Sequence, residues 1–514
     1  MSIRQTHVAG AFAVLSLSLL LVPDAGCSSK SSGDDNASDD GGGGGGGDDG
    51  GCTGFSCSGD DGSSVQVQQC AAGSNLQCQQ VSCPNKGTTS LKGVIYDPAG
   101  KHPLYNVSVY VPNSPPVMLP DGASCASCST WYTDPLVTAL TDPGGNFEID
   151  DMPVGKNIPL IVQVGKWRHI YTLSNVQQCV SNDAASLAGG MLRMPKNHME
   201  GDIPNIAVST GQADSLECLL FRMGIDKSEY TGDPMGAGRI HIFTGGNSPA
   251  GNGGAATNAP VSKQSYQYLW NRDASMTPYD VVLLSCEGNE TSFLNDAGRL
   301  VLSDYANNGG RVFASHYHYS WFTPSGPFST LTPPLATWQT ATVGYVGTPT
   351  SAYNADIVTT LPNGMPFPEG VAMKQWLQNV GALTNGLLPI YYSRHNADVT
   401  AANTHSQSWV SLDPSTPAPN ATQYFSFDTP VGLNASEQCG RIVYSDLHVS
   451  GGAGSEADPT VQPDYPGFSS GGIVPDGCAS HDLTAQEKAL EFMIFDLSSC
   501  LTPVGVTPVP ITPK

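Results

Sequence analysis

Short runs of alternating apolar and polar residues fill positions 90–165 of this chain. The runs are separated by Asp-Pro and Gly-Gly pairs, as at Asp97-Pro98 and Gly144-Gly145. Because successive side chains of a strand point to opposite faces, a period of two predicts short antiparallel strands that bury one face in a small β-sandwich. The residues expected to point inward are Val94, Val107, Val109, Val111, Phe147, Ile149, Leu160, Val162 and Val164.

The pattern changes after residue 210, where longer apolar runs alternate with helical periodicity. Residues 279–285 (YDVVLLS) form a continuous apolar run, which is typical of a strand buried in a parallel sheet. Apolar residues recur at helical spacing over 293–305, a Gly-Gly pair follows, and residues 311–316 form the next strand-like run. Strand–helix–strand units of these lengths predict right-handed crossovers and a doubly wound, flavodoxin-like α/β domain.

The last third of the chain adds two strand-like runs and a helix. Residues 421–428 and 441–449 are the strand-like runs, and residues 483–497 are apolar at helical spacing. Thr484 and Glu487 have the spacing of a capping box, which predicts that this helix begins just after Thr484.

The N-terminus has the features of a secretory signal. One Arg and no acid precede the apolar stretch 8–22, and Ala25-Gly26-Cys27 follows it. These residues resemble a bacterial lipoprotein cleavage box, although Asp24 replaces the usual apolar residue. The resemblance implies that Cys27 becomes the lipidated first residue and that Ser28 directs the protein to the outer membrane. The alternative is an ordinary cleaved signal, with Cys27 available for a disulfide.

Residues 27–51 predict a disordered tether, because they are nearly all Ser, Gly and Asp, with seven consecutive glycines at 41–47. The formal net charge of −23 argues against nucleic acid or an anionic membrane surface as a partner. The membrane contact expected for this protein is therefore the lipid anchor.

The 14 cysteines indicate disulfides, as is usual for an exported chain. Lipidation of Cys27 leaves an odd number, so one thiol should remain, and Cys286 is our candidate. The Cys125-Ala-Ser-Cys128 segment has no second CxxC or suitably spaced His to complete a zinc knuckle, so a structural disulfide is favoured over zinc or redox chemistry.

The β-rich segment closely resembles the carboxypeptidase regulatory-like (transthyretin-like) module, which is a non-catalytic fold common in secreted proteins. The matching residues are Gly93, Val94, Asp97, Gly100, Pro103, Leu104, Thr141, Asp142, Gly145, Phe147, Pro153, Val154 and Gly155.

The later segments YDVVLLSCEG, LVLSDYANNGGRVFASHYH and GRIVYSDLHVS resemble the class I glutamine-amidotransferase-like fold, in its trehalose-utilisation-protein-like branch. In that family a Gly-x-Cys-x-Gly elbow follows the strand equivalent to residues 311–314. Here the position reads Ser315-His316-Tyr317, without a cysteine or glycines. His448 matches the family's late histidine, but the usual Pro-Glu after it is replaced, so glutamine hydrolysis is not expected.

These patterns divide the chain into six segments. They are a lipoprotein-type signal (1–26), the tether (27–51), a Cys-rich segment (52–87), the regulatory-like β-sandwich (88–210), the amidotransferase-like α/β domain (211–502) and a C-terminal tail (503–514).

Ligands of an open α/β sheet bind beyond the carboxyl ends of its strands. Three interpretations of the residues there remain open. In the first, His316, His318, Asp446 and His448 supply ligands for a hydrolytic zinc centre. In the second, Cys286 or Ser315 is a nucleophile, with His448 or His316 as base and Glu287 orienting it.

In the third interpretation, the aromatic run from His316 to Trp321 is a binding wall for sugar or a partner and does no chemistry. Whichever holds, Cys286, His316 and His448 should converge to within about 10 Å if the α/β prediction is right.

Three functions follow from these interpretations. The leading one is a lipid-anchored envelope protein that binds or scaffolds, with a cell-surface glycan or an envelope protein as partner. The second is an envelope hydrolase or carbohydrate-active enzyme that uses Cys286, His316, His318 and His448. The third is a carbohydrate-binding surface protein.

Acylation at Cys27 is directly testable. Expression of the full precursor in a bacterial host with radiolabelled fatty acid should label the protein, and Cys27→Ser should abolish that label. Label that persists in this variant would exclude Cys27 as the lipidated residue.

Overall fold

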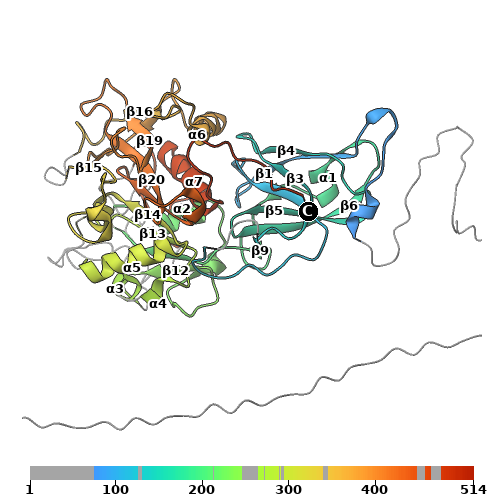
Figure 1. Cartoon of the computed structure of the whole chain (residues 1–514). Helices are drawn as coiled ribbons and strands as arrows, with labels where there is room; N and C mark the ends of the chain where they lie inside the picture. The colour runs from blue at the N-terminus through green and yellow to red at the C-terminus, as the bar shows by residue number, and fades with distance from the viewer. Residues whose placement is uncertain are drawn as a thin grey trace, which may run out of the picture. The chain divides into compact units, whose positions relative to one another are not determined.

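The computed structural model describes most of the chain after residue 74 (Figure 1). The described residues are 75–125, 130–211, 213–245, 264–270, 273–288, 290, 294–339, 345–448, 458–464 and 476–513. The chain divides into two units, Met1–Asp60 and Asp61–Lys514, and every described residue belongs to the second. The expected signal, Cys27 and the tether lie outside the described residues, and so does most of the Cys-rich segment. Among the described helices, none has the length and apolar character needed to cross a bilayer.

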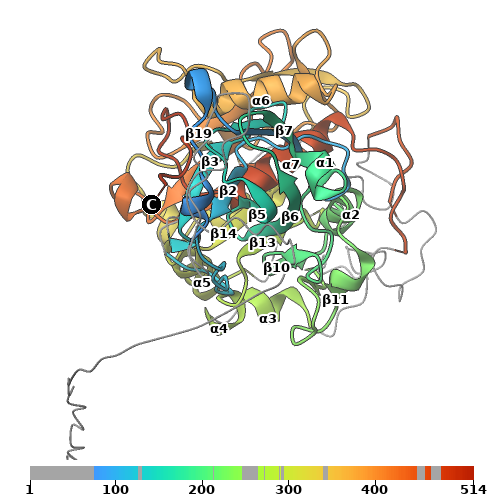
Figure 2. The same ribbon diagram turned by 90° about the vertical axis from the view of Figure 1, so that its right-hand side faces the viewer.

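Two of the sheets are formed by the first part of the described chain. One has β1 at its centre, paired with β4, β7 and β8, and the other has the order β3-β2-β5-β6-β9. The strands of the first sheet are β1 (Ser90–Tyr96), β4 (Asn146–Ile149), β7 (Ser181–Asp183) and β8 (Leu192–Arg193). Those of the second are β2 (Ser108–Pro112), β3 (Pro135–Leu140), β5 (Gly155–Val164), β6 (Trp167–Val176) and β9 (Gly201–Asp202). The short helix α1 (Ala184–Ala188) packs against β6 (Figure 2).

Both sheets contribute to one buried cluster, as the period-two pattern predicts. Eight of the nine residues expected to point inward are buried, and Val94 is the exception. On β1 the buried apolar residues are Leu91 and Ile95, so the inward position between them is Gly93. A Cβ at Gly93 would lie 2.8 Å from the ring of Phe147, which explains why the inward face has no side chain there. The pairing also differs in part from the antiparallel prediction, because β7 and β8 run parallel to β1.

The third sheet has ten strands and joins a parallel half to an antiparallel half (Figure 1). Its parallel half has the order β11 (Tyr230–Thr231), β12 (Ile240–Phe243), β10 (Ile206–Ser209), β13 (Val281–Leu284), β14 (Arg311–Ser315) and β21 (Gly440–Ser445). Its antiparallel half continues with β20 (Thr422–Thr429), β19 (Gln407–Leu412), β16 (Tyr353–Ile357) and β17 (Leu388–Ile390). A separate ribbon pairs β15 (Thr337–Trp338) with β18 (Ala397–Asp398). The strands expected at 279–285, 311–316, 421–428 and 441–449 are all present. β10 precedes residue 211 and yet belongs to this sheet.

Helices cover both faces of the parallel half. Val281 and Leu283 of β13 lie in one buried cluster with residues of α2 (Leu216–Arg222) and α7 (Ala485–Ser498). Their neighbours Val282 and Leu284 lie in a second cluster with α3 (Tyr266–Trp270), α4 (Asp273–Met276) and α5 (Asp296–Asn307). Since alternate residues of a strand face opposite ways, each cluster lies on its own side of the sheet. The remaining helix, α6 (Pro368–Asn379), packs on α7. Thr484 and Glu487 form the predicted capping box of α7.

Three disulfides join described residues, namely Cys83–Cys179, Cys125–Cys439 and Cys218–Cys478. The disulfide expected at Cys125 is therefore present, but its partner is 314 residues away in sequence rather than within the CxxC segment. Cys286 takes part in no disulfide, as the odd cysteine count suggested.

A buried ion-pair network ties the parallel half to its neighbours. Arg441 of β21 donates to Asp428 of β20 at 2.7 Å and to Asp496 of α7 at 2.9 Å. Only 4% of the Arg441 side chain is exposed, so these charges are held in a medium that screens them weakly.

Removing Arg441 should therefore destabilise the protein strongly. Arg441→Met leaves the buried Asp496 carboxylate and the partly buried Asp428 carboxylate without their cation, and we expect a loss of about 3–5 kcal/mol in urea unfolding. Lys92→Met is the matched control, because Lys92 and Glu148 form a pair whose side chains are 55% and 51% exposed. That control should cost less than about 1 kcal/mol. Equal losses of stability in the two variants would contradict a stabilising role for the Arg441 ion pairs.

Candidate functional site

Cys286 lies two residues beyond the end of β13 and is fixed by its backbone. Its carbonyl accepts a hydrogen bond from Ala213 N at 3.0 Å, and its amide donates to the Asp214 carboxylate at 3.4 Å. A Cβ at Gly211 would lie 2.3 Å from the Cys286 carbonyl oxygen, so a glycine is needed where the two segments pass. The segment after β10 therefore holds Cys286 in place, and the cysteine side chain is buried.

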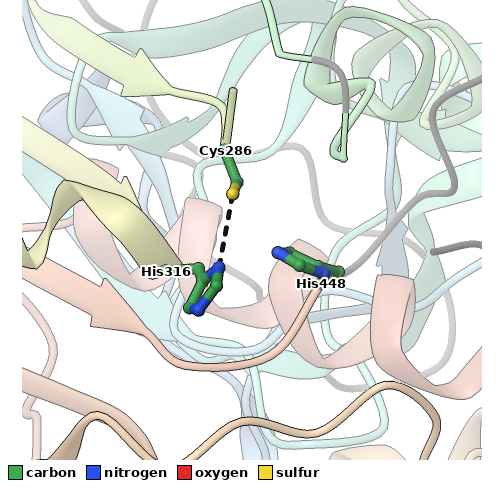
Figure 3. Close-up of side chains that lie close together, drawn as sticks. All are labelled: Cys286, His316 and His448. Carbon is green, nitrogen blue, oxygen red and sulfur yellow. Dashed lines mark hydrogen bonds between the residues drawn. The ribbon is translucent and has the colours of Figure 1, made fainter. Parts of the chain in front are cut away.

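His316 occupies the sharp turn at the end of β14. Its φ of 44° is in the left-handed region, which is costly for a residue with a Cβ. A 3₁₀ helix, His316–Trp321, begins at this residue. Tyr444 of the neighbouring strand donates a hydrogen bond to the His316 carbonyl at 3.0 Å. The turn directs the imidazole toward Cys286, and Nδ1 lies 3.4 Å from the cysteine sulfur (Figure 3).

His448 completes the group from the end of β21. The Ser445 hydroxyl donates a hydrogen bond to the Leu447 carbonyl at 2.8 Å, which closes the turn that leads to His448. The His448 carbonyl accepts a hydrogen bond from Gln486 of α7. Its ring centroid lies 4.9 Å from that of His316, with the two planes at 81° (Figure 3).

The structure thus brings together three of the residues singled out from the sequence. One ligand atom from each of Cys286, His316 and His448 lies within 4.8 Å of the others, which confirms the expected convergence. All three side chains are buried. A thiol and two imidazoles at this spacing can exchange a proton or share a metal ion.

His318 lies outside this group. Its Nε2 is 2.9 Å from the Ser285 carbonyl, and its Nδ1 accepts a hydrogen bond from Trp321 at 2.9 Å. In the neutral ring, both nitrogens are therefore engaged in hydrogen bonds. Burial lowers the pKa of His318 to about 4, so it stays neutral. His318 attaches the 3₁₀ helix to the segment that carries Cys286, and this corrects the expectation that it is a metal ligand.

Asp446 is also outside the group, because its carboxylate caps a loop. It accepts hydrogen bonds from the backbone of Asn396 and from Ala397 N at 3.3 Å, and it shares the Tyr444 hydroxyl proton, at 3.1 Å, with the His316 carbonyl. Burial raises the pKa of Asp446 to about 6 against the effect of these hydrogen bonds. The expected metal role of Asp446 is thus replaced by a structural one.

Ser315 and Glu287 do not join the cluster either. The Ser315 hydroxyl donates to Asp214, a buried carboxylate that also receives the Cys286 amide. Glu287 is buried. It lies beside Gly245, just after the end of β12, where a Cβ added to Gly245 would be 3.5 Å from the Glu287 Cγ. The sequence patterns did not point to Asp214, because the short strand that precedes it was not expected.

The aromatic run after His316 is largely internal. Trp321 and Tyr319 are buried, and the Trp321 ring packs 5.0 Å from that of Trp270. These rings belong to the core on the α5 side of the sheet, so they do not form a wall at the surface.

Comparison with known proteins places the chain in no family. No family model matches it, and no curated protein matches it. Two solved structures of type II cohesin–X-dockerin complexes from Acetivibrio cellulolyticus match 27% and 29% of this chain, each at 14% identity. They cover 85% and 78% of their own chains, at TM-scores of 0.15 and 0.14. A cytoplasmic protein from Salmonella typhimurium matches 48% of this chain and 88% of its own at 10% identity, with a TM-score of 0.25.

The strained turn gives a test of the site's geometry. At most buried positions a protein with alanine is more stable than one with glycine. At a φ of 44° the glycine variant should be the more stable of the two. We expect His316→Gly to be more stable than His316→Ala by about 1–2 kcal/mol in urea unfolding. The same pair at His318, which has no positive φ, is the control and should favour alanine. An alanine preference at His316 would rule out the left-handed turn.

Proposed function

We propose that this protein is an exported, membrane-anchored envelope hydrolase in which Cys286, His316 and His448 bind a zinc ion. The observation that carries the proposal is the convergence of their ligand atoms to within 4.8 Å. Tetrahedral zinc, with Zn–S near 2.3 Å and Zn–N near 2.0–2.1 Å, requires a sulfur–nitrogen separation of about 3.5 Å. The observed separation between Cys286 Sγ and His316 Nδ1 is 3.4 Å.

The composition of the group favours a metal over a thiol nucleophile. A nucleophilic Cys–His pair needs a third group that orients the base, usually a carboxylate or amide. Asp446, the carboxylate nearest His448 in sequence, is engaged by the 396–397 backbone. Three protein ligands of nitrogen and sulfur, with a fourth position left for water, are instead the usual set of a catalytic zinc site.

Each residue then has a defined task. Cys286 binds as the thiolate, and both histidines bind as neutral rings. Tyr444 and Gln486 hold the backbone carbonyls of His316 and His448 and so orient the two rings. Zinc in such a site lowers the pKa of a bound water and makes it a nucleophile at neutral pH.

The fold and the location belong to the same proposal. The parallel strand order, with helices on both faces, supports an amidotransferase-like α/β domain whose cysteine elbow is replaced by His316. The two smaller sheets support a carboxypeptidase regulatory-like β-sandwich. We propose that lipidated Cys27 holds both at the outer membrane.

A second candidate function is glycan binding, which one pocket favours. It has a volume of about 510 Å³ and lies beside the antiparallel half of the large sheet. Amide side chains, among them Asn363, Asn403, Gln407 and Gln438, line it together with several hydroxyl groups. Such groups hydrogen-bond sugar hydroxyls, so a glycan of the cell surface is the proposed partner for this pocket.

Metal analysis of the mature chain tests the main proposal. After reconstitution with zinc and removal of excess metal, Cys286→Ser and His448→Gln should each contain one equivalent less than the wild type. With cobalt in place of zinc, the wild type should show a thiolate charge-transfer band that Cys286→Ser lacks.

His405→Gln serves as the matched control and should keep the wild-type metal content, because His405 lies on the 510 Å³ pocket rather than in the cluster. A wild type that shows no cobalt–thiolate band, and whose metal content Cys286→Ser does not change, would refute the proposed centre.

A further inference from the structure

A second cluster of metal-ligating side chains lies where the loop after β1 contacts α7. Asp97 and His102 come from the loop, and Glu491 comes from the helix. One ligand atom from each lies within 4.8 Å of the others. Asp97 and Glu491 are almost fully buried, with 1% and 0% of their surface exposed.

The loop holds Asp97 rigidly. One carboxylate oxygen, Oδ1, accepts hydrogen bonds from the backbone amides of Lys101 at 2.6 Å and His102 at 3.1 Å. The Asp97 amide donates to the His102 carbonyl at 2.8 Å. Because Oδ1 takes both amide bonds, the loop leaves Oδ2 for a further partner.

Glu491 contacts His102 and also forms a side-chain hydrogen bond with Asp97. His102 Nδ1 lies 2.6 Å from its Oε2. Its other oxygen, Oε1, accepts no hydrogen bond from a donor among the described residues, although it is buried. A buried carboxylate oxygen without a donor is costly, so this atom points to a missing positive partner.

The two neighbouring lysines form no hydrogen bond with Glu491 Oε1. Lys101 pairs with Asp482, and Lys488 donates to the Val380 carbonyl at 2.8 Å. Burial and the repulsion between the two carboxyls raise the pKa of Asp97 to about 7, and a bound cation would offset the two negative charges. Burial and the charge of Glu487 raise the pKa of Glu491 to about 8, against a hydrogen bond with Asp97 and the charge of Lys488.

We propose that Asp97, His102 and Glu491 bind a divalent cation, with zinc the best match, and that the ion fastens the β1 loop to α7. Two carboxylates and an imidazole suit zinc better than calcium or magnesium, which take oxygen ligands. The two carboxylates would neutralise the ion, and the free Oε1 would gain a partner. This site is separate from the Cys286 centre and does not depend on it.

The test uses the mature chain with Cys286→Ser in every variant, so that metal at the first centre does not contribute. After zinc reconstitution, Cys286→Ser should retain one equivalent of zinc, and chelation should lower its thermal unfolding midpoint. Adding Glu491→Gln or His102→Gln should remove both the metal and the effect of the chelator. Glu491→Gln keeps the size of the side chain and introduces no charge, so the variant should fold.

Glu148→Gln is the matched control, since Glu148 is exposed and should leave zinc binding unchanged. The proposal is overturned if Cys286→Ser retains no zinc, or if Glu491→Gln leaves the zinc content unchanged. A wild type that binds no more zinc than Cys286→Ser would refute the proposed function and leave this second site standing. A pH-dependent midpoint that Glu491→Gln abolishes, without any bound metal, would instead identify a proton shared by the two carboxyls.

Discussion

The cluster of Cys286, His316 and His448 depends on four parallel strands that end in register at one edge of the large sheet. Leu284 of β13 lies opposite Ser209 of β10 and Ala314 of β14, and Ser315 lies opposite Ser445 of β21. The hydrogen-bonded ladder fixes these positions along the strands, so residues that follow within a few positions must emerge side by side. This is why Cys286, His316 and His448 meet although as many as 162 positions separate them in sequence (448 − 286). A shift of one residue in any of these pairings would turn the corresponding side chain to the other face.

The helix α7 contacts this edge of the sheet and two other buried groups. At its N-terminal end α7 holds the His448 carbonyl through Gln486. One to two turns later it presents Glu491 to the β1 loop, and near its C-terminal end Asp496 pairs with Arg441 of β21. The cluster, the Asp97–His102–Glu491 group and the buried ion-pair network therefore share one rigid element. Substitutions that displace α7 should affect all three, and single-site variants with matched controls are needed to separate them.

Regular elements with strong periodicity were predictable from the sequence. The runs at 279–285 and 311–316 became β13 and β14, and the capping box at Thr484 and Glu487 begins α7. Their apolar positions are numerous enough to decide which face is buried, whatever packs there. β10 was missed because its apolar run, residues 206–208, is shorter than that of β13 and is flanked by polar residues. Asp214, which follows β10 and supports Cys286, was missed for the same reason.

The sequence by itself determined that strands deliver Cys286, His316 and His448 to one sheet edge, because strand ends and parallel order follow from local patterns. Only the tertiary structure decided which polar neighbours remain available there. His318 and Asp446 have ligand side chains near the same strand ends, but Ser285, Trp321 and the 396–397 backbone bind them. The partner of Cys125 and the contact between Asp97 and Glu491 were decided in the same way. Such pairings depend on distances between segments remote in sequence, and these are set by packing of the whole core rather than by any local pattern.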